Sequence, residues 1–349
     1  MKVSTSDFGK TPDGNDALLW TIENSLGTRI SLTNWGATIA SVATPDSRGH
    51  VDEITLGFND ASAYTSENGY MGATIGRCAD IISGGRLVLD GKTRNLLINR
   101  GKNHLHGGER GFNRYLWGAE PFTEADAAGV LFTLVSEDGD EGYPGRLTVR
   151  ASYGLSEGNR LMMLFEAETD ALTVVNITNH SYWNLAGAGS GTILDHEIMW
   201  NASRYLPLDS DDIPLGTRPE VESTPYDFRS PRKIGAAIDS LTGGYDNSMV
   251  IDGVPGILRT AAVLKDPGSG RILRLSTDRP VVQFFTAENL DGAVGAGGRK
   301  HEYRGAVCLE PQDYPDAPNQ PNFPSTELQP GDTYKHLSVI DFSVDRPSG

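Results

Sequence analysis

Short stretches in which apolar and polar residues alternate, separated by turn residues, run through most of this chain. A period of two is typical of strands with one buried face. Windows with the period of an α-helix are scarce, and the modest candidate covers residues 232–241. Strands at such close spacing favour an all-β fold, a large antiparallel β-sandwich or barrel, over a βαβ fold. The predicted strands cover residues 18–23, 29–33, 37–44, 53–58, 115–122, 129–136, 146–153, 160–169 and 172–178.

A hairpin is predicted around Asp90-Gly91, which separates the apolar-polar stretch 86–89 from the stretch 92–98. Asp followed by Gly supplies the positive φ angles that a type I′ turn requires. A second glycine-rich stretch, residues 292–298, has neither a strand before it nor a helix after it in the order that a phosphate-binding loop needs. We interpret it as a flexible loop.

The stretch Gly305-Ala306-Val307-Cys308-Leu309-Glu310 predicts a strand that ends in a carboxylate. In that strand Val307 and Leu309 would face a core, while Cys308 and Glu310 would share the opposite face. Prolines recur from Pro311 onward, so residues 311–323 are predicted to form a stiff polar loop outside the sheet. Glu310 is thus either part of a site beside this loop or a solvated glutamate at a strand end.

Composition narrows the class of protein. The chain has 349 residues, 38% of them hydrophobic and 22% charged, with a formal net charge of -16. This charge repels phosphate backbones and anionic lipids, so we expect neither nucleic-acid nor membrane partners. The first residues lack the apolar segment of a secretion signal, and Cys78 and Cys308 are too few for a disulfide framework. We expect a cytoplasmic protein with a single domain over residues 1–349, because no linker or repeat divides it.

Two histidine motifs stand out, Asn103-His104-Leu105-His106-Gly107-Gly108 and residues 178–185 (TNHSYWNL). In an extended segment His104 and His106 would point to the same side, and the glycines would let a backbone or ligand approach closely. Three of the seven histidines fall in these motifs. We interpret this clustering as a site.

Several chemistries fit these residue types. His104, His106 and Glu109, with a distant ligand, could bind a metal ion. Glu310 with Asp246 or Asp313 could form the carboxylate pair of a glycosidase. A Glu base opposite a His acid would suit a reaction that moves protons between oxygens. No Gly-x-Ser-x-Gly elbow indicates a nucleophilic serine.

Five motifs in order resemble the aldose 1-epimerase (galactose mutarotase) family: residues 103–108 (NHLHGG), 179–185 (NHSYWNL), 243–246 (GGYD), 282–286 (VQFFT) and 308–323. The resemblance runs from about residue 28 to residue 342 and implies a galactose mutarotase-like β-supersandwich. It also implies an enzyme that binds a free sugar and interconverts its α and β anomers without cofactor or metal. A non-catalytic sugar-binding protein of the same fold is the alternative.

The resemblance assigns roles by motif. Glu310 would be the general base on the C1 hydroxyl and His180 the general acid at the ring oxygen. Their reference pKa values make an ionised Glu310 and a partly protonated His180 the expected states, with little tuning needed. Further residues are expected to bind or line the sugar: His106, Asp246, Gln283 and Tyr182.

The chain departs from the family pattern at three places. Asp80-Ile81 stands where Asn-Arg is usual, so Asp80 is expected at the sugar, with Arg77 or Arg110 supplying the missing guanidinium. Histidine is also usual at the positions of Asn247 and Asp313 in this chain. We therefore predict a preferred sugar other than galactose or glucose: a pentose, a deoxy sugar or an acidic derivative. The oligomeric state cannot be predicted.

Overall fold

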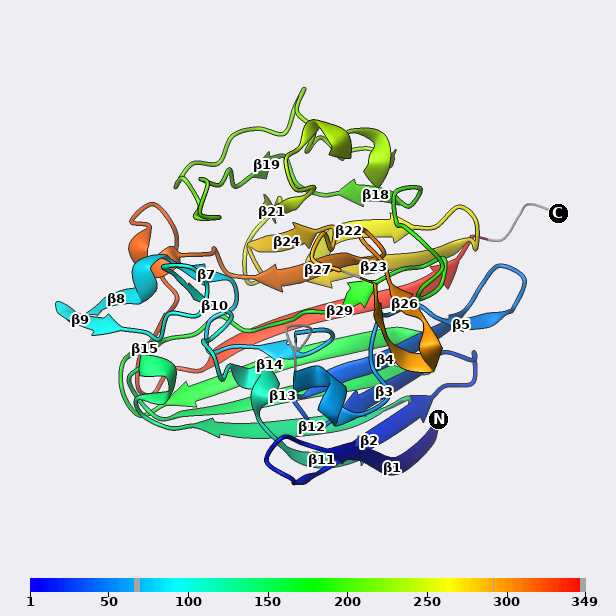
Figure 1. The fold of residues 1–349 in the computed structure, drawn as a ribbon, viewed down its shortest axis with the longest axis horizontal. Coiled ribbons are helices and arrows are strands. Elements are labelled where there is room, and N and C mark those ends of the chain that lie inside the picture. Colours follow the sequence, from blue (N-terminus) through cyan, green and yellow to red (C-terminus); the bar gives the residue numbers. More distant parts are fainter. Residues whose placement is uncertain (66–69, 291, 346–349) are drawn as a thin grey trace.

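The protein, described by a computed structural model, is built almost entirely from antiparallel strands. The structure describes residues 1–65, 70–290 and 292–345 (Figure 1). Helical segments in these ranges are 3-10 turns of three to five residues, so the all-β prediction is confirmed. The turns are η1 (Ala61–Thr65), η2 (Ser83–Gly85), η3 (Phe112–Arg114), η4 (Asp140–Gly142), η5 (Ile234–Ala236), η6 (Ile238–Ser240), η7 (Ala296–Gly298) and η8 (Ala317–Asn319).

A nine-stranded sheet forms the widest layer of the molecule. The C-terminal strand β29 lies in its middle, hydrogen-bonded to β14 on one side and to β23 on the other (Figure 1). Strands from the two halves of the chain are therefore joined in one sheet. In spatial order the strands are β11 (Gly118–Thr123), β12 (Ala127–Ser136), β13 (Leu147–Ser156), β14 (Arg160–Thr169), β29 (Tyr334–Val344), β23 (Arg271–Thr277), β22 (Arg259–Lys265), β18 (Glu197–Trp200) and β20 (Arg232–Lys233).

Two five-stranded sheets complete the large layers. The first is a meander in chain order: β1 (Lys2–Lys10), β2 (Asp16–Glu23), β3 (Arg29–Thr33), β4 (Thr38–Pro45) and β5 (Val51–Glu53). The second has the spatial order β17 (Tyr182–Trp183), β27 (Val307–Gln312), β24 (Val281–Phe285), β21 (Asp246–Val250) and β19 (Arg204–Tyr205). The second sheet carries four of the residues predicted to form the site: Tyr182, Glu310, Gln283 and Asp246.

The main core is shared by all three large sheets. Trp20 on β2 meets Phe132 on β12 with ring centroids 6.0 Å apart, and Trp200 on β18 meets Phe284 on β24 at 5.5 Å. Inward side chains alternate with outward ones along β12 and β13, as the sequence pattern predicted. Burying each such side chain contributes roughly 1.5–3 kcal/mol, so this interface accounts for much of the driving force for the fold.

Five separate two-stranded ladders lie outside the large sheets in the described ranges: β6 (Thr74–Ile75) with β16 (Thr178–Asn179), β7 (Ile81–Ile82) with β10 (His104–Leu105), β8 (Arg86–Leu89) with β9 (Lys92–Asn95), β15 (Thr173–Val174) with β28 (Glu327–Leu328), and β25 (Ala293–Val294) with β26 (Lys300–His301). The β8–β9 hairpin was predicted. Its Asp90 and Gly91 have φ angles of 49° and 69°, as a type I′ turn requires.

Some predicted elements differ in the structure. Residues 232–241 form β20 and the turns η5 and η6 in place of an α-helix, because Ala237 between the turns has a φ of -139°. Residues 53–58 pair regularly only at β5, and residues 172–178 split between β15 and β16. The glycine-rich stretch 292–298 contains β25 and η7, so it is less irregular than predicted. Over the described ranges, no helix is long and apolar enough to cross a membrane.

Candidate active site

Strand β27 places Glu310 inside the protein. Val307 and Leu309 belong to the main core, while Cys308 packs in a second cluster that includes Tyr182. This confirms the alternation predicted for the strand. Glu310 lies on the face of Cys308 and is 3% exposed, so its interpretation as a solvated glutamate is wrong.

The strand also continues further than predicted, through Pro311 to Gln312. Strand β17 pairs only with Val307 and Cys308, so at Pro311 the hydrogen-bonded neighbour is β24 alone. A proline without an N–H is tolerated at such a locally unpaired edge. The extension places Gln312, two residues after Glu310, beside the site.

His180 faces Glu310 from the segment between β16 and β17. Its Nε2 lies 3.6 Å from Glu310 Oε1, and the side chains are 6% and 3% exposed. The ring is stacked between Tyr182, at a centroid distance of 5.0 Å, and Tyr70, at 6.1 Å. At 3.6 Å the pair is too far apart for a good hydrogen bond. The stacking therefore holds the imidazole beside the carboxylate without joining the two.

Polar atoms of this pair lack partners. Glu310 accepts no hydrogen bond at its carboxylate from the described residues, and within the same residues the buried Nδ1 of His180 has none. An unsatisfied buried group costs about 1–3 kcal/mol, and more if charged. The site therefore keeps hydrogen-bonding capacity for a ligand.

Burial sets the protonation states of the pair. It lowers the pKa of His180 to about 4. It also raises the pKa of Glu310 well above its usual value, and the charges of Asp80 and Asp246 raise it further. Both shifts oppose the expected ionised Glu310 and partly protonated His180, because desolvation outweighs their mutual attraction. In the ligand-free protein burial therefore favours the neutral form of each side chain.

On one side of Glu310, a chain of hydrogen bonds crosses the sheet. Gln283 lies opposite Glu310 on β24, and its Nε2 donates to Asp246 Oδ1 at 2.8 Å. Ser248 on β21 donates to Gln283 Oε1 at 2.6 Å. Asp246 is exposed as a residue, but the surrounding protein desolvates its carboxylate. This desolvation and, to a lesser extent, the charge of Asp80 raise the pKa of Asp246 to about 7. These contacts fix a carboxyl group and an amide beside Glu310.

On the other side, Asp80 is hydrogen-bonded to both Gln312 and His106. Gln312 Nε2 donates to Asp80 Oδ2 at 2.9 Å, and burial raises the Asp80 pKa to about 6. The backbone N–H of Asp80 donates to His106 Nδ1 at 3.0 Å. Because that nitrogen accepts, the neutral His106 ring carries its proton on Nε2. His106 therefore presents a fixed N–H donor, and its ring lies 5.4 Å from that of His180.

The two histidines of the first motif do not share a side. His106 has a φ of 51°, which breaks the extended geometry after His104. His104 Nδ1 donates to Leu97 O and its Nε2 accepts from Tyr143 OH, each at 2.7 Å, so both its nitrogens are occupied. The glycine expectation is confirmed at Gly107, where a Cβ atom would lie 1.8 Å from Gly76 O. The metal site considered as an alternative on His104, His106 and Glu109 is not formed, because neither His104 nitrogen is free to bind a metal ion.

Arg77 and Arg110 do not supply the missing guanidinium. Arg77 is 2% exposed, and its terminal nitrogens donate to a closed set of protein acceptors: Pro144 O, Gly145 O, Thr173 Oγ1, Ser136 O, Ser136 Oγ and Glu137 O. Arg110 lies over the Tyr115 ring at 4.5 Å and near Asp13 on the surface. The structure therefore separates Arg77 from the other predicted sugar-binding residues.

The remaining departures from the family pattern are bonded within the protein. Asn247 donates to Leu206 O and accepts from Tyr226 OH. Asp313 accepts from Arg279 at 3.0 Å. Ile81 is 2% exposed in β7. Tyr182 lies under His180, and its OH accepts from Asn289 at 3.4 Å.

Sequence reasoning missed Tyr70, Ser248 and Gln312. Gln312 could have been found from the period of two after Glu310, had Pro311 not been taken as the end of the strand. Tyr70 and Ser248 carry no such signal, because their roles depend on ring stacking and cross-strand pairing.

Among the residues that the structure describes, one group could hold a metal ion. His180, Cys308 and Glu310 each offer a ligand atom, these atoms lie within 4.8 Å of one another, and all three residues are buried.

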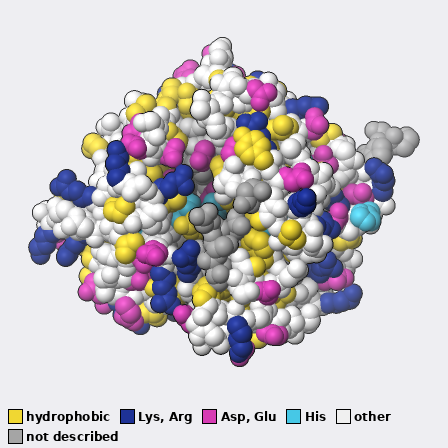
Figure 2. Space-filling model, in the orientation of Figure 1, with side chains coloured by type: hydrophobic (Ala, Val, Ile, Leu, Met, Phe, Trp, Pro, Cys, Tyr) yellow, Lys and Arg dark blue, Asp and Glu magenta, His cyan; other side chains and the backbone are white. Residues whose placement is uncertain are grey.

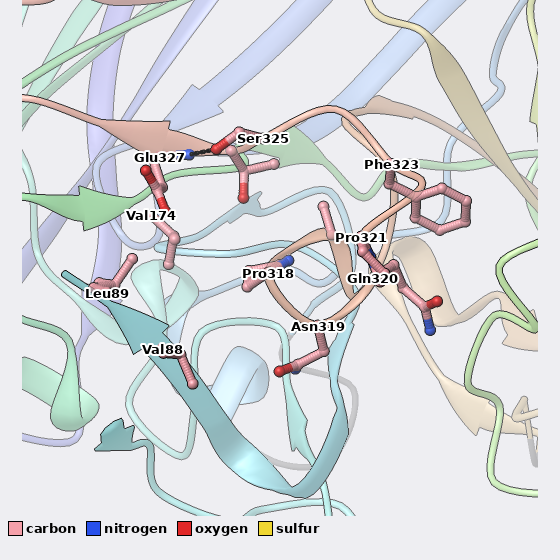
Figure 3. A pocket seen from close by; sticks show the side chains of 12 residues that line it. Val88, Leu89, Val174, Pro318, Asn319, Gln320, Pro321, Phe323, Ser325 and Glu327 are labelled. Carbon is pink, nitrogen blue, oxygen red and sulfur yellow. Dashed lines mark hydrogen bonds between the residues drawn. The ribbon is translucent and has the colours of Figure 1, made fainter. Parts of the chain in front are cut away.

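Near the middle of the face drawn in Figure 2, histidine side chains lie beside acidic ones. A separate hollow, between the β8–β9 hairpin and the loop 318–323, is lined by none of these residues (Figure 3).

Comparisons with known proteins agree with this geometry. The sequence profile of the family described as Aldose 1-epimerase matches residues 18–341. The chain belongs to the aldose 1-epimerase family. This epimerase-family chain is 39% identical to galactose mutarotase of Bos taurus, with 99% of each chain covered. It is 33% identical to aldose 1-epimerase of Escherichia coli, with 96% of this chain and 97% of that one covered.

Solved structures of the family share the fold. An aldose epimerase homologue from C. elegans matches with a TM-score of 0.87 and 28% identity, covering 98% of this chain and 99% of that one. Galactose 1-epimerase from Lactobacillus acidophilus also matches with a TM-score of 0.87, at 27% identity, covering 99% and 100%. The predicted galactose mutarotase-like β-supersandwich is confirmed.

Proposed function

We propose that this epimerase-family protein interconverts the α and β anomers of a free aldose. The observation that carries the proposal is the buried pair itself: His180 Nε2 and Glu310 Oε1 lie 3.6 Å apart, and no donor among the described residues is bound to the carboxylate. A pair of opposed proton-transfer groups suits a reaction that takes a proton from one oxygen and delivers one to another. Mere sugar binding would not require such a pair, and this favours the enzyme over the sugar-binding alternative.

The bound sugar brings Glu310 and His180 to the protonation states that proton transfer requires. Hydroxyl groups of the sugar supply hydrogen bonds that Glu310 lacks, and hydrogen bonds to a carboxylate lower its pKa. The proton then passes from Glu310 to His180, so the carboxylate and imidazolium form with no net proton exchange with solvent. The pair shares one proton and titrates as a unit.

Glu310 as general base then removes the proton of the C1 hydroxyl. His180 as general acid gives its proton to the ring oxygen, and the bond between C1 and that oxygen breaks. Rotation of the resulting aldehyde about the C1–C2 bond exposes its other face. The reverse steps close the ring in either anomeric form and restore both protons.

The surrounding polar groups position the sugar. We assign the His106 Nε2–H as a donor to the ring oxygen or a neighbouring hydroxyl, because its Nδ1 is already occupied. Asp246, Gln283 and Asp80 accept from and donate to the other hydroxyls. Tyr182 and Tyr70 hold the His180 ring by stacking.

The charge of the site bears on the sugar class. Besides burial, the charges of Asp80 and Asp246 raise the pKa of Glu310 and the charge of Asp80 raises that of Asp246, and no guanidinium from Arg77 offsets them. A sugar carboxylate would add a fourth carboxyl group to this cluster. We therefore propose a neutral sugar, a pentose or a deoxy sugar, and set aside the acidic sugar considered from sequence. The cytoplasmic location, the single domain and the lack of cofactor stay predictions.

The test is anomer exchange, followed by polarimetry and exchange NMR, on galactose, glucose, arabinose, a 6-deoxyhexose and galacturonate. We expect exchange well above the spontaneous rate for the neutral sugars, a pentose or the deoxyhexose with the highest kcat/KM, and galacturonate the slowest. Galactose with the highest kcat/KM would refute the predicted preference. Exchange at the spontaneous rate for every sugar would refute the activity and favour a binding protein.

A further inference from the structure

We propose that His180, Cys308 and Glu310 form a reversible binding site for a thiophilic divalent cation, best suited to Zn²⁺, and that the bound ion blocks the active site. The binding part stands on the geometry of the three side chains. The blocking part rests on the proposed function of Glu310 and His180.

The spacing of the ligand atoms fits a zinc ion. All three atoms lie within 4.8 Å of one another, and His180 Nε2 lies 3.6 Å from Glu310 Oε1. Zinc bonds of about 2.0–2.3 Å in a tetrahedron separate two ligands by roughly 3.3–3.8 Å. The His–Glu distance, too long for a hydrogen bond, thus suits two ligands of one ion. Small side-chain rotations would bring the thiol to the same distance.

The donors are of the right kind and are held in place. Thiolate, imidazole and carboxylate together favour zinc over calcium or magnesium, which prefer oxygen ligands alone. Cys308 and Glu310 share one face of β27, and His180 is fixed between Tyr182 and Tyr70. Asp80 and Asp246 add negative charge around Glu310. Within the described part of the chain, no hydrogen bond occupies the carboxylate.

Three protein ligands leave a fourth position for water or a sugar hydroxyl, as in open zinc sites. On binding, the Cys308 thiol and the Glu310 carboxyl group lose their protons to solvent, and sulfur–metal, oxygen–metal and nitrogen–metal bonds form without oxidation or reduction. The lone pairs of Glu310 and His180 that would exchange protons with the sugar are then bound to the ion. Bound zinc would therefore stop proton transfer until a chelator removes it.

Binding is tested on the full chain after chelator treatment, with Cd²⁺ as a spectroscopic probe and Zn²⁺ calorimetry. We expect one ion per chain and a thiolate-to-metal absorption band. Cys308→Ser should abolish the band and weaken zinc binding at least about tenfold. Cys78→Ser is the matched control, because Cys78 is also a buried free thiol but packs in a different cluster. It should bind as wild type does.

A wild-type protein without the band, or a band that survives Cys308→Ser, would overturn the site. The blocking part is tested by anomer exchange with added Zn²⁺, each variant being compared with its own metal-free rate. We expect inhibition of wild type and Cys78→Ser that EDTA reverses, and weaker inhibition of Cys308→Ser. Undiminished turnover with zinc bound through Cys308 would refute the blocking. A metal-free protein without turnover would instead refute the proposed function, while the binding result would still decide the site.

Discussion

Arg77 and Glu310 are equally deep in the protein, with 2% and 3% exposure, but their surroundings differ. The terminal nitrogens of Arg77 make six hydrogen bonds, and only its Nε lacks a partner within the described residues. The Glu310 carboxylate has none from that same part of the chain. Buried polar groups that a protein leaves unsatisfied cost stability, and they concentrate where function needs them. The comparison therefore distinguishes a residue that stabilises the fold from one whose hydrogen-bonding capacity is kept for a ligand.

The largest expected effect is on stability at Arg77. Arg77→Met would leave several buried carbonyl groups without donors, so we expect the free energy of unfolding to fall by about 3 kcal/mol or more. Urea unfolding measures this loss. Arg110→Met, at an exposed guanidinium, is the control and should change stability by less than about 0.5 kcal/mol. A raised KM for sugar with unchanged stability would show instead that Arg77 reaches the substrate.

The second effect is on catalysis at His180. His180→Gln removes the proton donor to the ring oxygen, and we expect kcat to fall about 100-fold. His104→Gln sharpens the comparison, because both ring nitrogens of His104 are already hydrogen-bonded within the protein, as the terminal nitrogens of Arg77 are. It should cost about 1–3 kcal/mol of stability and leave kcat of the folded protein unchanged. Equal losses of kcat in the two variants would contradict the assignment.

The smallest effect is a pH dependence at Asp246. Its folded pKa, about 7, lies above the unfolded value, so its contribution to stability is greatest at low pH and is lost as pH rises through 7. Asn does not titrate. Asp246→Asn should therefore raise the unfolding temperature, relative to wild type, more at pH 8 than at pH 5. The difference should be modest because the side chain is partly solvated, and the opposite sign in a calorimetric scan would refute the raised pKa.

The sequence was informative where a local pattern determines the structure. Alternation along residues 307–310 predicted which side chains face the core, and Asp90-Gly91 predicted the hairpin turn. The motifs of the family predicted the fold and brought Glu310, His180 and His106 together. In these cases the period of two or the turn chemistry is sufficient without knowledge of distant contacts.

The sequence was misleading where contacts between residues far apart in the chain determine the local structure. Pro311 continues strand β27 because the neighbouring strand β17 has already ended. His106 points away from the side of His104 because the backbone of His106 itself has a left-handed φ. The acceptors of Arg77 lie at least 59 residues away in the sequence. The protonation states of Glu310 and His180 depend on burial, and reference pKa values carry no information about burial.

The account depends on a buried carboxylate that serves the substrate and not the fold. The most direct measurement compares Glu310→Gln with wild type in both anomer exchange and urea unfolding. We expect kcat to fall at least about 100-fold, with stability unchanged or higher because the amide cannot ionise beside Asp80 and Asp246 as the buried carboxyl group can. A variant as active as wild type, or one whose activity falls only because it unfolds, would contradict the account.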